Sequence, residues 1–554
     1  MQATSELLTE QDIIRLMSTL CEVLSQNAHS VKHCSSEHLL ENAELRNELL
    51  REAAKSENHK LRRLAYKLLR VDFEKVFGNS ENHSDDVNNS VEHKHSRYSN
   101  KVQKHSGKGN QQLALLKGTI VGLSLVLIIT LGLLFQSDIN SLFNQRFEVS
   151  GSISQDATWT ADKEYILNSV VYVEQGAKLT IEAGTRIKGN RGSALIITRG
   201  SQLIASGNPG QPVIFSSNKT NGERTRGDWG GVVLLGNAPI NRGVTAHIEG
   251  IPDDDNRGDF GGEESQSSCG ILQYVRIEFA GYEVYTDNEL NGLTLGGCGS
   301  STIVRYVQIH KALDDGVEVF GGTVNLKNIV ITGAKDDSFD WDMGWQGKVQ
   351  FLVVQQHLDG GDNGFEGDNF KKNPLATPIS RPVFYNVTMI GANNSQISQR
   401  AMNIRRGSGG IFNNFIITGF SNESIDLRGN YVADLIENGD LSYSNILFYS
   451  IGKNGKQYFS NESGKKDDDN GFIEADYLTR PSLNNKFGFD PRLPVSIFNP
   501  VEPDFTPYSH SPARESKANI PQGEFWDEGA NYLGAIRPGI ATNWLQRWTS
   551  FPVN

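Results

Sequence analysis

Beyond residue 150, short runs of alternating apolar and polar residues are each followed by Gly, Asn or Asp. Such alternation predicts β-strands, because successive side chains of a strand point to opposite faces. Three stretches superpose without gaps at offsets of 22 and 23 residues, namely 304–323, 326–345 and 349–368. The unit starts at residue 272 and continues less closely to residue 452. A period of this length, built from short strands, predicts a solenoid with one coil per repeat.

Two kinds of solenoid share this period. A leucine-rich repeat needs a regular leucine pattern and a helical return, and the chain has neither. In a β-solenoid, alternating residues such as Ile329 and Ile331 point inward and are buried when the coils stack. We therefore predict an all-β parallel solenoid over 150–480. Residues 481–554, which hold ten of the 17 prolines and three tryptophans, are predicted to cap its last coil.

An apolar run divides the chain. The residues from Gly118 to Phe135 carry no charge and would span about 27 Å as a helix, close to the ~30 Å core of a bilayer. The run is apolar on every side, which favours a membrane span over a buried core helix, and Leu113 extends it if Lys117 snorkels. We therefore predict one transmembrane helix over 113–135, in contact with the lipid bilayer.

Flanking charges predict the orientation of this span. Lys101, Lys104 and Lys108 precede it, whereas Asp138 follows it. The positive-inside rule then places the N-terminal side in the cytoplasm and exports the C-terminal domain. In a bacterium this predicts a single-pass inner-membrane protein with a periplasmic domain.

The N-terminal side is predicted to be helical. Apolar residues recur at helical spacing after a start at Thr9 that resembles a capping box. Residues 1–78 are therefore predicted to form a cytoplasmic α-helical region that offers a surface to a protein partner. Residues 79–112 are rich in Asn, Ser, His and Lys and are predicted to be a flexible linker.

Charge and composition exclude several classes of protein. In 136–554, 36 Lys and Arg stand against 49 Asp and Glu, so this part has a net charge of −13. A nucleic-acid-binding surface would be basic, so we predict no nucleic-acid partner. Four cysteines in 554 residues exclude a disulfide-rich scaffold. The chain also has no Ser-His-Asp, P-loop or dinucleotide fingerprint.

Several stretches resemble a known family. They are GDWGGVVLLGNAPIN at 227–241, RGDFGGEE at 257–264, LQYVRIEFAGYEV at 272–284, NELNGLTLGG at 288–297, DDGVEVFGGTVN at 314–325 and NYLGAIRPG at 531–539. They resemble bacterial right-handed parallel β-helix proteins, which are secreted or surface proteins of Bacteroidetes and marine bacteria. The resemblance covers roughly 150–554. It implies a right-handed parallel β-helix but no activity, because the function of that family is not established.

Two cysteines depart from the pattern of this family. Cys269 and Cys298 precede two successive strand runs, so stacked coils would bring them within the ~4.4–6.8 Å between Cα atoms that a disulfide needs. In an oxidising compartment we predict that they pair. The alternative is two buried thiols.

Carboxylates recur at one corner of the repeat. The predicted metal ligands are Asp314, Asp315, Asp336, Asp337, Asp359 and Asp362, and Glu318, Asp340, Asp342, Glu366 and Asp368 lie close to them in the sequence. Like charges stacked one coil apart repel unless a cation compensates them, and Ca²⁺ suits sites made of several carboxylates. The alternative is that these aspartates hydrogen-bond the turn backbone.

The same region supplies candidates for catalysis. Polysaccharide lyases share the β-helix fold and use a basic residue to remove a proton beside a uronate carboxylate, a role for which Arg405 and Arg406 are the best candidates. The alternative for both is ion pairing with the nearby carboxylates. Paired carboxylates on adjacent coils would instead suit glycoside hydrolysis, for which Asp337 and Asp340 are candidates. A domain of negative net charge repels polyuronates, which counts against a lyase.

Aromatic residues and the repeated surface guide the functional hypotheses. Trp341 and Trp345 are predicted either to stack on sugar rings or to pack between coils. The repeat contains no unique catalytic constellation. We therefore predict a membrane-anchored extracytoplasmic module with a binding or structural role, whose ligand is a glycan or another envelope component. Ca²⁺ is the predicted stabiliser. One alternative is a carbohydrate-active enzyme, of lyase or glycoside hydrolase type, that uses the 314–406 face. Another alternative is a single-pass transmembrane sensor.

Overall fold

The computed structural model describes residues 145–554, apart from 286–287, 460–467 and 518–519. The chain separates into two compact units, 1–112 and 113–554, and the described residues all belong to the second. The predicted helical region, linker and membrane span precede residue 145, so they lie outside the described part. Within that part, no helix is both long and apolar enough to cross a bilayer.

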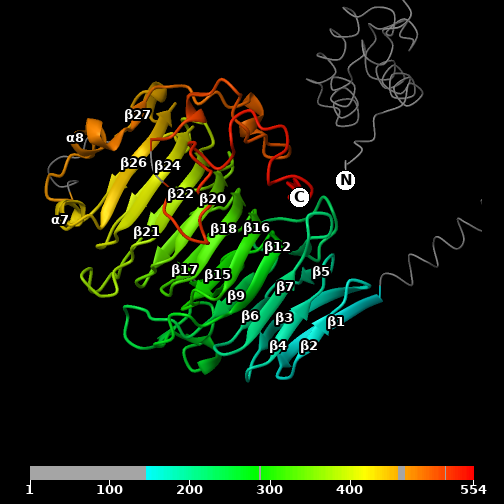
Figure 1. Ribbon diagram of the computed structural model, residues 1–554. Coiled ribbons are helices and arrows are strands. Elements are labelled where there is room, and N and C mark those ends of the chain that lie inside the picture. The colour runs from blue at the N-terminus through cyan, green and yellow to red at the C-terminus, as the bar shows by residue number, and fades with distance from the viewer. Residues whose placement is uncertain (1–144, 286–287, 460–467, 518–519) are drawn as a thin grey trace, which may run out of the picture. The chain divides into compact units, whose positions relative to one another are not determined.

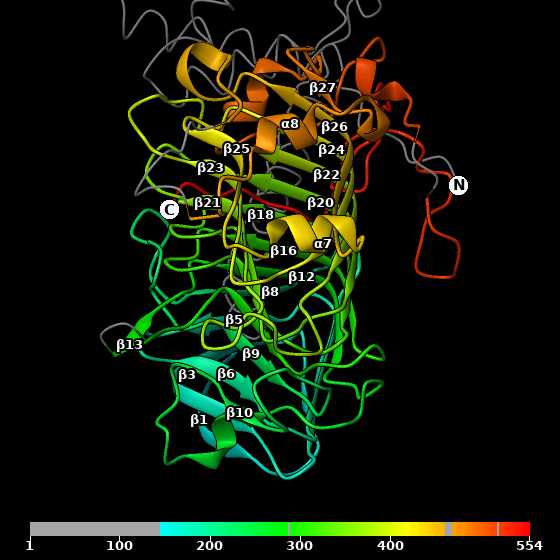
Figure 2. The same cartoon turned by 90° about the vertical axis from the view of Figure 1, so that its left-hand side faces the viewer.

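The described chain winds into a parallel β-helix with three walls (Figure 1 and Figure 2). The first and second walls contain β2 (Ala157–Trp159), β4 (Lys178–Ile181), β5 (Arg186–Gly189), β7 (Gln202–Ser206), β8 (Val213–Ser217), β12 (Gly270–Glu278), β16 (Ile303–His310), β18 (Asn325–Thr332), β20 (Lys348–Gln355), β22 (Val383–Ile390), β24 (Gly410–Thr418), β26 (Leu441–Tyr449) and β27 (Lys486–Phe487). The third wall contains β6 (Ala194–Ile197), β9 (Val232–Leu235), β15 (Leu293–Gly296), β17 (Val317–Phe320), β19 (Phe339–Asp342), β21 (Asn363–Gly367), β23 (Arg400–Ile404) and β25 (Glu423–Leu427). Two long strands, β1 (Gln145–Ile153) and β3 (Lys163–Val173), pass from the second wall into the third. The parallel pairing confirms the predicted solenoid and fits a right-handed β-helix.

One residue with positive φ turns each long strand from the first wall into the second. These residues follow one another in register and are Tyr274, Tyr306, Asn328, Phe351, Asn386, Asn414 and Asn445. Four of the seven are asparagine, which tolerates the left-handed backbone better than most residues. In the preceding coil, the loop between β7 and β8 makes the same turn.

Alternating side chains fill the interior. Ile329 and Ile331 of β18 are completely buried, as their spacing predicts. Aromatic rings continue the core through the middle coils, where the ring of Phe384 lies 4.9 Å from that of Phe365 and 5.6 Å from that of Phe412. Each such buried side chain contributes about 1.5–3 kcal/mol, which becomes available only when coils stack.

An insertion covers the outer side of the third wall in its first coils. It lies between β9 and β12 and contains the hairpin of β10 (Ala246–His247) and β11 (Asp259–Phe260). Ile248 and Phe260 of the insertion pack on Val233 and Phe320 of the wall. A second, smaller hairpin pairs β13 (Glu283–Tyr285) with β14 (Asn288–Glu289). The outer side of the third wall is therefore apolar and covered by the insertion in the first coils. Its exposed polar part lies in later coils.

The last coil is closed as the sequence predicts. β27 pairs with β26, and the ring of Phe487 stacks on that of Phe448 with 4.7 Å between centroids. Two short helices, α7 (Val432–Glu437) and α8 (Glu474–Leu478), lie in the same part of the chain. This closure ends near residue 488.

Residues 489–554, here called the C-terminal strap, do more than cap the last coil. They run back along the outer side of the second wall, as the orange and red segment of Figure 1 shows. The outward residues of that wall include Val330 and Val353, which the strap buries with Ile536 and Trp548. The prediction that 481–554 only caps the solenoid is therefore corrected, because apolar outward positions on β18 to β26 require a cover along several coils.

Candidate functional site

One outward side chain per coil of the third wall forms a continuous row. On β19, Phe339 and Trp341 point into the core, so Asp340 between them points outward. The strand register places Glu318, Asp340, Glu366, Asn403 and Asp426 side by side in successive coils. We call these five residues the ladder. Neighbouring strands are about 4.8 Å apart, so consecutive ladder groups interact directly.

Five of the six predicted metal ligands gather at the turn that precedes the third wall, and we call them the corner. They are Asp314, Asp315, Asp336, Asp337 and Asp362. Three groups bring their ligand atoms within 4.8 Å of one another, namely Asp314 with Asp315 and Asp336, Asp315 with Glu318 and Asp340, and Asp336 with Asp337 and Asp362. The second group joins the corner to the ladder, so the two sets form one carboxylate surface.

Corner carboxylates also hold the turns of neighbouring coils together. Asp315 Oδ1 accepts the backbone N–H of Asp337 at 2.9 Å. Asp337 Oδ1 in turn accepts the backbone N–H of Asn363 at 2.7 Å. Hydrogen bonding of aspartate to the turn backbone, the alternative to metal binding, is therefore present at two corner positions.

Burial and neighbouring like charges raise the pKa of four carboxyl groups well above the usual range. They are Asp315, Glu318, Asp337 and Asp340. Burial is the largest cause in each case, and the charge of Glu366 is the next for Asp337 and Asp340. Of the four, Asp340 acts electrostatically on Arg405, whose ion pairs in the described structure are with Glu366 and Asp368. A buried carboxylate without a cation is costly, so these groups favour protonation or a metal ion at neutral pH.

Arginines compensate the carboxylates at the other end of the ladder. Arg400 Nε lies 2.7 Å from a carboxylate oxygen of Glu423 and 3.3 Å from one of Asp426. Arg428 Nη2 lies 2.8 Å from Asp426. This end of the surface therefore combines hydrogen-bond acceptors with guanidinium donors.

Arg405 and Arg406 both bind Asp368. Arg405 Nε donates to Asp368 Oδ1 at 2.8 Å, and Arg405 also pairs with Glu366. Burial alone would lower the pKa of Arg405, but the hydrogen bond and charge of Asp368 raise it further above its ordinary value. Ion pairing with the carboxylates, the alternative to a lyase base, is therefore the observed arrangement of both arginines.

Two carboxyl groups of this surface titrate near neutrality. Burial raises the pKa of Glu366 to about 7, although the charge of Arg405 opposes the shift. Burial also raises the pKa of Asp342 to about 6, although the backbone N–H of Met343 opposes it. Groups with such pKa values are suited to donate or accept a proton at neutral pH.

The family model of the pectate-lyase like beta helix domain matches residues 151–479, which include the corner and the ladder. The chain belongs to this family. No curated protein and no solved structure matches the chain significantly. Membership establishes the parallel β-helix and fits a carbohydrate-related module. Membership in the family does not assign a role to any residue of this pectate-lyase like domain.

The two tryptophans beside the carboxylates point into the core of the pectate-lyase like domain. Trp341 and Trp345 are both completely buried. Trp341 Nε1 donates to Ser408 Oγ at 2.9 Å, and Trp345 Nε1 donates to the carbonyl of Val324 at 3.1 Å. The prediction that they stack on sugar rings is therefore wrong, and packing between coils is the observed alternative. Strand alternation places Trp341 on the inner face of β19.

Asp359 is separate from the corner. Its two carboxylate oxygens accept hydrogen bonds from Arg226 at 2.7 and 2.8 Å. The hydrogen bonds and charge of Arg226 hold the pKa of Asp359 well below its usual range. Asp359 is therefore removed from the predicted metal ligands. Arg226 lies 133 residues earlier in the chain, so no local pattern indicated this pair.

Cys269 and Cys298 are joined by a disulfide, with 5.7 Å between their Cα atoms. Both residues are buried beside the interior of the solenoid. They precede β12 and β16, two strands that pair directly. The disulfide therefore clamps two neighbouring coils.

Three neutral residues that the sequence analysis does not single out belong to the carboxylate surface. Asn291 Nδ2 donates to Glu318 at 2.5 Å, and Asn363 Nδ2 donates to Asp337 at 2.9 Å. The buried Oδ1 atoms of both, and the buried Oγ of Ser338, have no hydrogen-bond partner in the described structure. A sequence signal existed, because Asn363 precedes an inward phenylalanine of the third wall by two residues, as Asp337 does.

Proposed function

We propose that this pectate-lyase like domain is an extracytoplasmic module that binds a glycan or another component of the cell envelope along the ladder. The observation that carries the proposal is the row of outward polar groups, one per coil, in which Glu318 has no described arginine partner and Asp426 at the other end pairs with two arginines. Carboxylates accept hydrogen bonds from sugar hydroxyls, and guanidinium groups donate them. The ladder groups recur about every 4.8 Å along the wall, and Asp340 and Glu366 are the two that are partly exposed to a ligand.

The extracytoplasmic location belongs to the same proposal. The disulfide between Cys269 and Cys298 supports it, because disulfides persist in oxidising compartments. The apolar run 113–135 would anchor the domain to a bacterial inner membrane, with residues 1–78 in the cytoplasm. Binding of a cytoplasmic protein by 1–78, and with it a role as a sensor, stays a prediction.

A divalent cation at the corner would complete the site. Asp340 Oδ1, Ser338 Oγ and Asn363 Oδ1 are buried without hydrogen-bond partners in the described chain, so the donor set fits an ion that prefers oxygen. The carboxylates of Asp315 and Asp337 would supply the charge. Ca²⁺ matches this choice of ligands. Bound there, it would remove the repulsion between stacked carboxylates and leave Glu366 and the arginines to contact a glycan.

Glycoside hydrolysis is the second candidate function. Asp340 and Glu366 pair in register on neighbouring strands, and the pKa of Glu366 is raised to about 7. A carboxyl group with such a pKa suits a general acid, and the adjacent carboxylate would serve as its partner. A lyase is less well supported, because Arg405 is held in ion pairs.

The test uses the full-length chain in detergent, with a panel of neutral and acidic polysaccharides, with and without Ca²⁺. We expect saturable binding without new reducing ends. Arg406→Gln should weaken binding about tenfold, because it removes a charged hydrogen-bond donor. Asp434→Asn on α7 is the matched control and should not change affinity.

Two results would overturn this proposal. Reducing ends that disappear in Glu366→Gln would establish the hydrolase instead. Failure of every polysaccharide to bind, with and without Ca²⁺, would refute glycan binding along the ladder.

A further inference from the structure

The two ends of the solenoid are closed differently. At the C-terminal end, β27 covers β26, and the ring of Phe487 stacks on that of Phe448. At the other end, β1 and β2 are the outermost strands (Figure 1 and Figure 2). In the described part of the chain, β1 pairs with β3 alone and β2 pairs with β4 alone. The first coil therefore has an uncovered edge, which a solenoid normally protects with a cap or a partner.

Phe147 leaves part of the core exposed at this edge. It lies in register with the inward residue Tyr165, and the two ring centroids are 5.8 Å apart. Tyr165 is buried, whereas Phe147 is 54% exposed. The Nζ atom of Lys163 lies 6.0 Å from the centroid of the Phe147 ring, and the side chain of Arg146 is 66% exposed. An exposed aromatic ring beside cations is typical of surfaces that contact the interface between a membrane and water.

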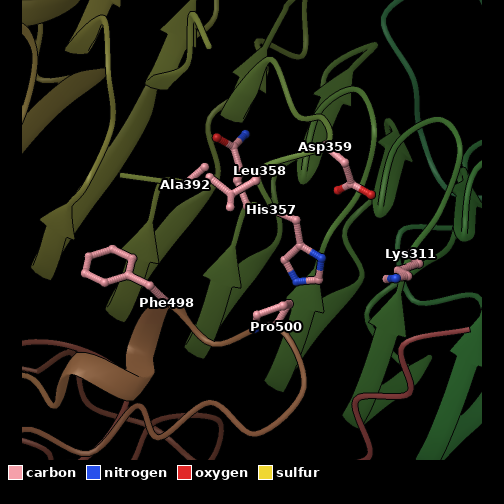
Figure 3. Close-up of a pocket in the computed structure, with 8 residues that line it drawn as sticks. Lys311, His357, Leu358, Asp359, Ala392, Phe498 and Pro500 are labelled. Carbon is pink, nitrogen blue, oxygen red and sulfur yellow. The ribbon is translucent and has the colours of Figure 1, made fainter. Parts of the chain in front are cut away.

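Further along the second wall, the strap covers comparable groups. Figure 3 shows Phe498 and Pro500 of the strap around a cavity of about 160 Å³, with Lys311 of the wall on the other side of it. Lys311 donates a hydrogen bond to the backbone carbonyl of Val553. The last strap residue, Asn554, accepts a hydrogen bond from Arg224 in the loop between β8 and β9. The outward residues of β1, β3 and β5 precede this loop and are exposed or partly exposed at their charged positions.

Cations outnumber carboxylates on this part of the second wall. The strand register aligns Arg146, Glu164 and Arg186, and Lys188 lies two residues after Arg186. Glu164 is shared by two cations, at 3.5 Å from Arg146 Nε and 2.9 Å from Lys188 Nζ. Arg186 is exposed and forms no ion pair with a described carboxylate. The other carboxylate of this face, Glu148, accepts a hydrogen bond from a side-chain amide.

We call this region the basic edge. It consists of one exposed aromatic residue and four cations, namely Phe147, Arg146, Lys163, Arg186 and Lys188. Its four cations stand against the two carboxylates of Glu148 and Glu164. The basic edge therefore has an excess of positive charge in an otherwise acidic domain.

The charge of the whole domain is divided in the same way. In 145–226, 10 Lys and Arg stand against 7 Asp and Glu, whereas in 227–554, 26 stand against 41. The first coils therefore have a net charge of +3, and the rest of the domain has one of −15. A surface of anionic lipids would attract the first part and repel the second. Charge alone would thus turn the first coils toward such a surface.

The predicted membrane span would keep a lipid surface within reach of the basic edge. The span ends at residue 135, and β1 begins at Gln145. The nine residues between them, even when fully extended, would cover only about 32 Å. Such a short tether gives the first coil a high effective concentration of lipid. This step rests on the membrane anchor of the proposed function.

We propose that the first coils dock on the membrane that anchors the chain, with the phosphates of anionic phospholipids bound by the basic edge and Phe147 inserted among the headgroups. Each cation near an anionic surface contributes about 1 kcal/mol to such docking. The phosphates would offset the positive excess, and the ring of Phe147 would leave water. The corner and the ladder belong to the negative part, so they would face away from the lipid and stay open to a glycan.

The test compares the full-length chain in nanodiscs of phosphatidylcholine with the same chain in nanodiscs that contain an equal amount of phosphatidylglycerol. Phenylglyoxal modifies exposed arginines, and mass spectrometry measures the rate at each position. We expect Arg146 and Arg186 to react about fivefold more slowly in the anionic discs. Arg492 near the closed end has a 54% exposed side chain and should react equally in both. Salt at about 1 M should abolish the difference, because it shortens the Debye length to ~3 Å.

Variants separate the lipid contact from folding. Phe147→Ser and Lys163→Gln should each reduce the protection of Arg186 in the anionic discs about twofold. Phe489→Ser removes a ring that is 56% exposed near the closed end, and it is the matched control for the aromatic residue. Lys372→Gln, at an exposed position of a later coil, is the matched control for charge. Both controls should leave the protection unchanged.

Equal modification rates of Arg146 and Arg186 in the two kinds of disc would overturn the proposal. Strong protection in both kinds, insensitive to salt, would also overturn it and would indicate that a second copy covers β1. Failure of the chain to enter either kind of disc would refute the anchor and the docking together, whereas entry with equal rates would refute the docking alone. Phe147→Ser should bind polysaccharides as the wild type does, which separates this surface from the ladder.

Discussion

The two ends of the ladder bury the same kind of group in different surroundings. Glu318 is 7% exposed and forms no ion pair with a described cation, whereas Asp426 is 3% exposed and contacts two arginines. Arg400 lies 3.3 Å from Asp426 and Arg428 lies 2.8 Å from it. At the first end, burial raises the pKa of Glu318 well above its usual range. Burial is therefore similar at both ends, and the supply of cations differs.

Asp426 receives one cation from the neighbouring coil, Arg400, and one from its own coil, Arg428. Strand register stacks Asn363, Arg400 and Glu423 in one column, which brings a guanidinium to the second end. At the first end, aspartates occupy the corresponding positions, and Asp315 accepts a hydrogen bond from the backbone N–H of Asp337. One end is thus suited to structural ion pairs, and the other is suited to a metal ion or to proton transfer.

Breaking the compensated end should have the largest effect. Arg400→Met leaves Glu423 and Asp426 buried with one cation fewer, and we expect it to lower the free energy of unfolding by about 3 kcal/mol. Denaturant titration at pH 7 measures this change. Glu318→Gln at the other end is the control and should not lower stability. A loss below about 1 kcal/mol in Arg400→Met would contradict the importance of the compensation.

Adding Ca²⁺ should act on the uncompensated end. At about a hundredfold excess over its dissociation constant, Ca²⁺ should stabilise the protein by about 2.7 kcal/mol, seen as a higher melting temperature that a chelator reverses. Asp337→Asn should abolish the shift, because Asp337 belongs to a corner group. Asp434→Asn should retain it. An equal shift in Asp337→Asn would place the ion elsewhere.

Changing pH should separate two carboxyl groups by the sign of their effect. The pKa of Glu318 is raised, so its stabilising contribution is complete below its ordinary value of 4.5 and is lost as the pH rises through the folded value. A glutamine at this position does not ionise. The free energy of unfolding of Glu318→Gln should therefore exceed that of the wild type by about 1 kcal/mol at pH 7, and the difference should disappear toward pH 4. Denaturant titrations across this range measure the difference.

Asp359 provides the opposite case. Arg226 lowers the pKa of Asp359, so its contribution is present above the ordinary value of 3.8 and is lost as the pH falls through the folded value. Asp359→Asn should therefore be destabilising at pH 7 and less so in acid. If lowering the pH changed the stability of both variants relative to the wild type in the same direction, the opposite pKa shifts inferred for Glu318 and Asp359 would be refuted.

Some features of the site could have been predicted more fully from the sequence. The alternation in Phe339, Asp340, Trp341 and Asp342 already implies that the aromatic residues share one face and the carboxylates the other. Of the two alternatives given for Trp341, this alternation favours packing between coils over stacking on a sugar ring. By contrast, nothing in the local sequence around Asp359 points to Arg226, because that contact joins residues 133 positions apart.

What the sequence determined by itself is the coil. The period, the alternation and the turn residues predicted parallel strands, inward Ile329 and Ile331, and the corner carboxylates, because each depends on neighbours within one or two repeats. Only the tertiary structure decided which carboxylates meet an arginine and where the C-terminal strap lies. Both depend on contacts between distant parts of the chain, and periodicity carries no information about such contacts.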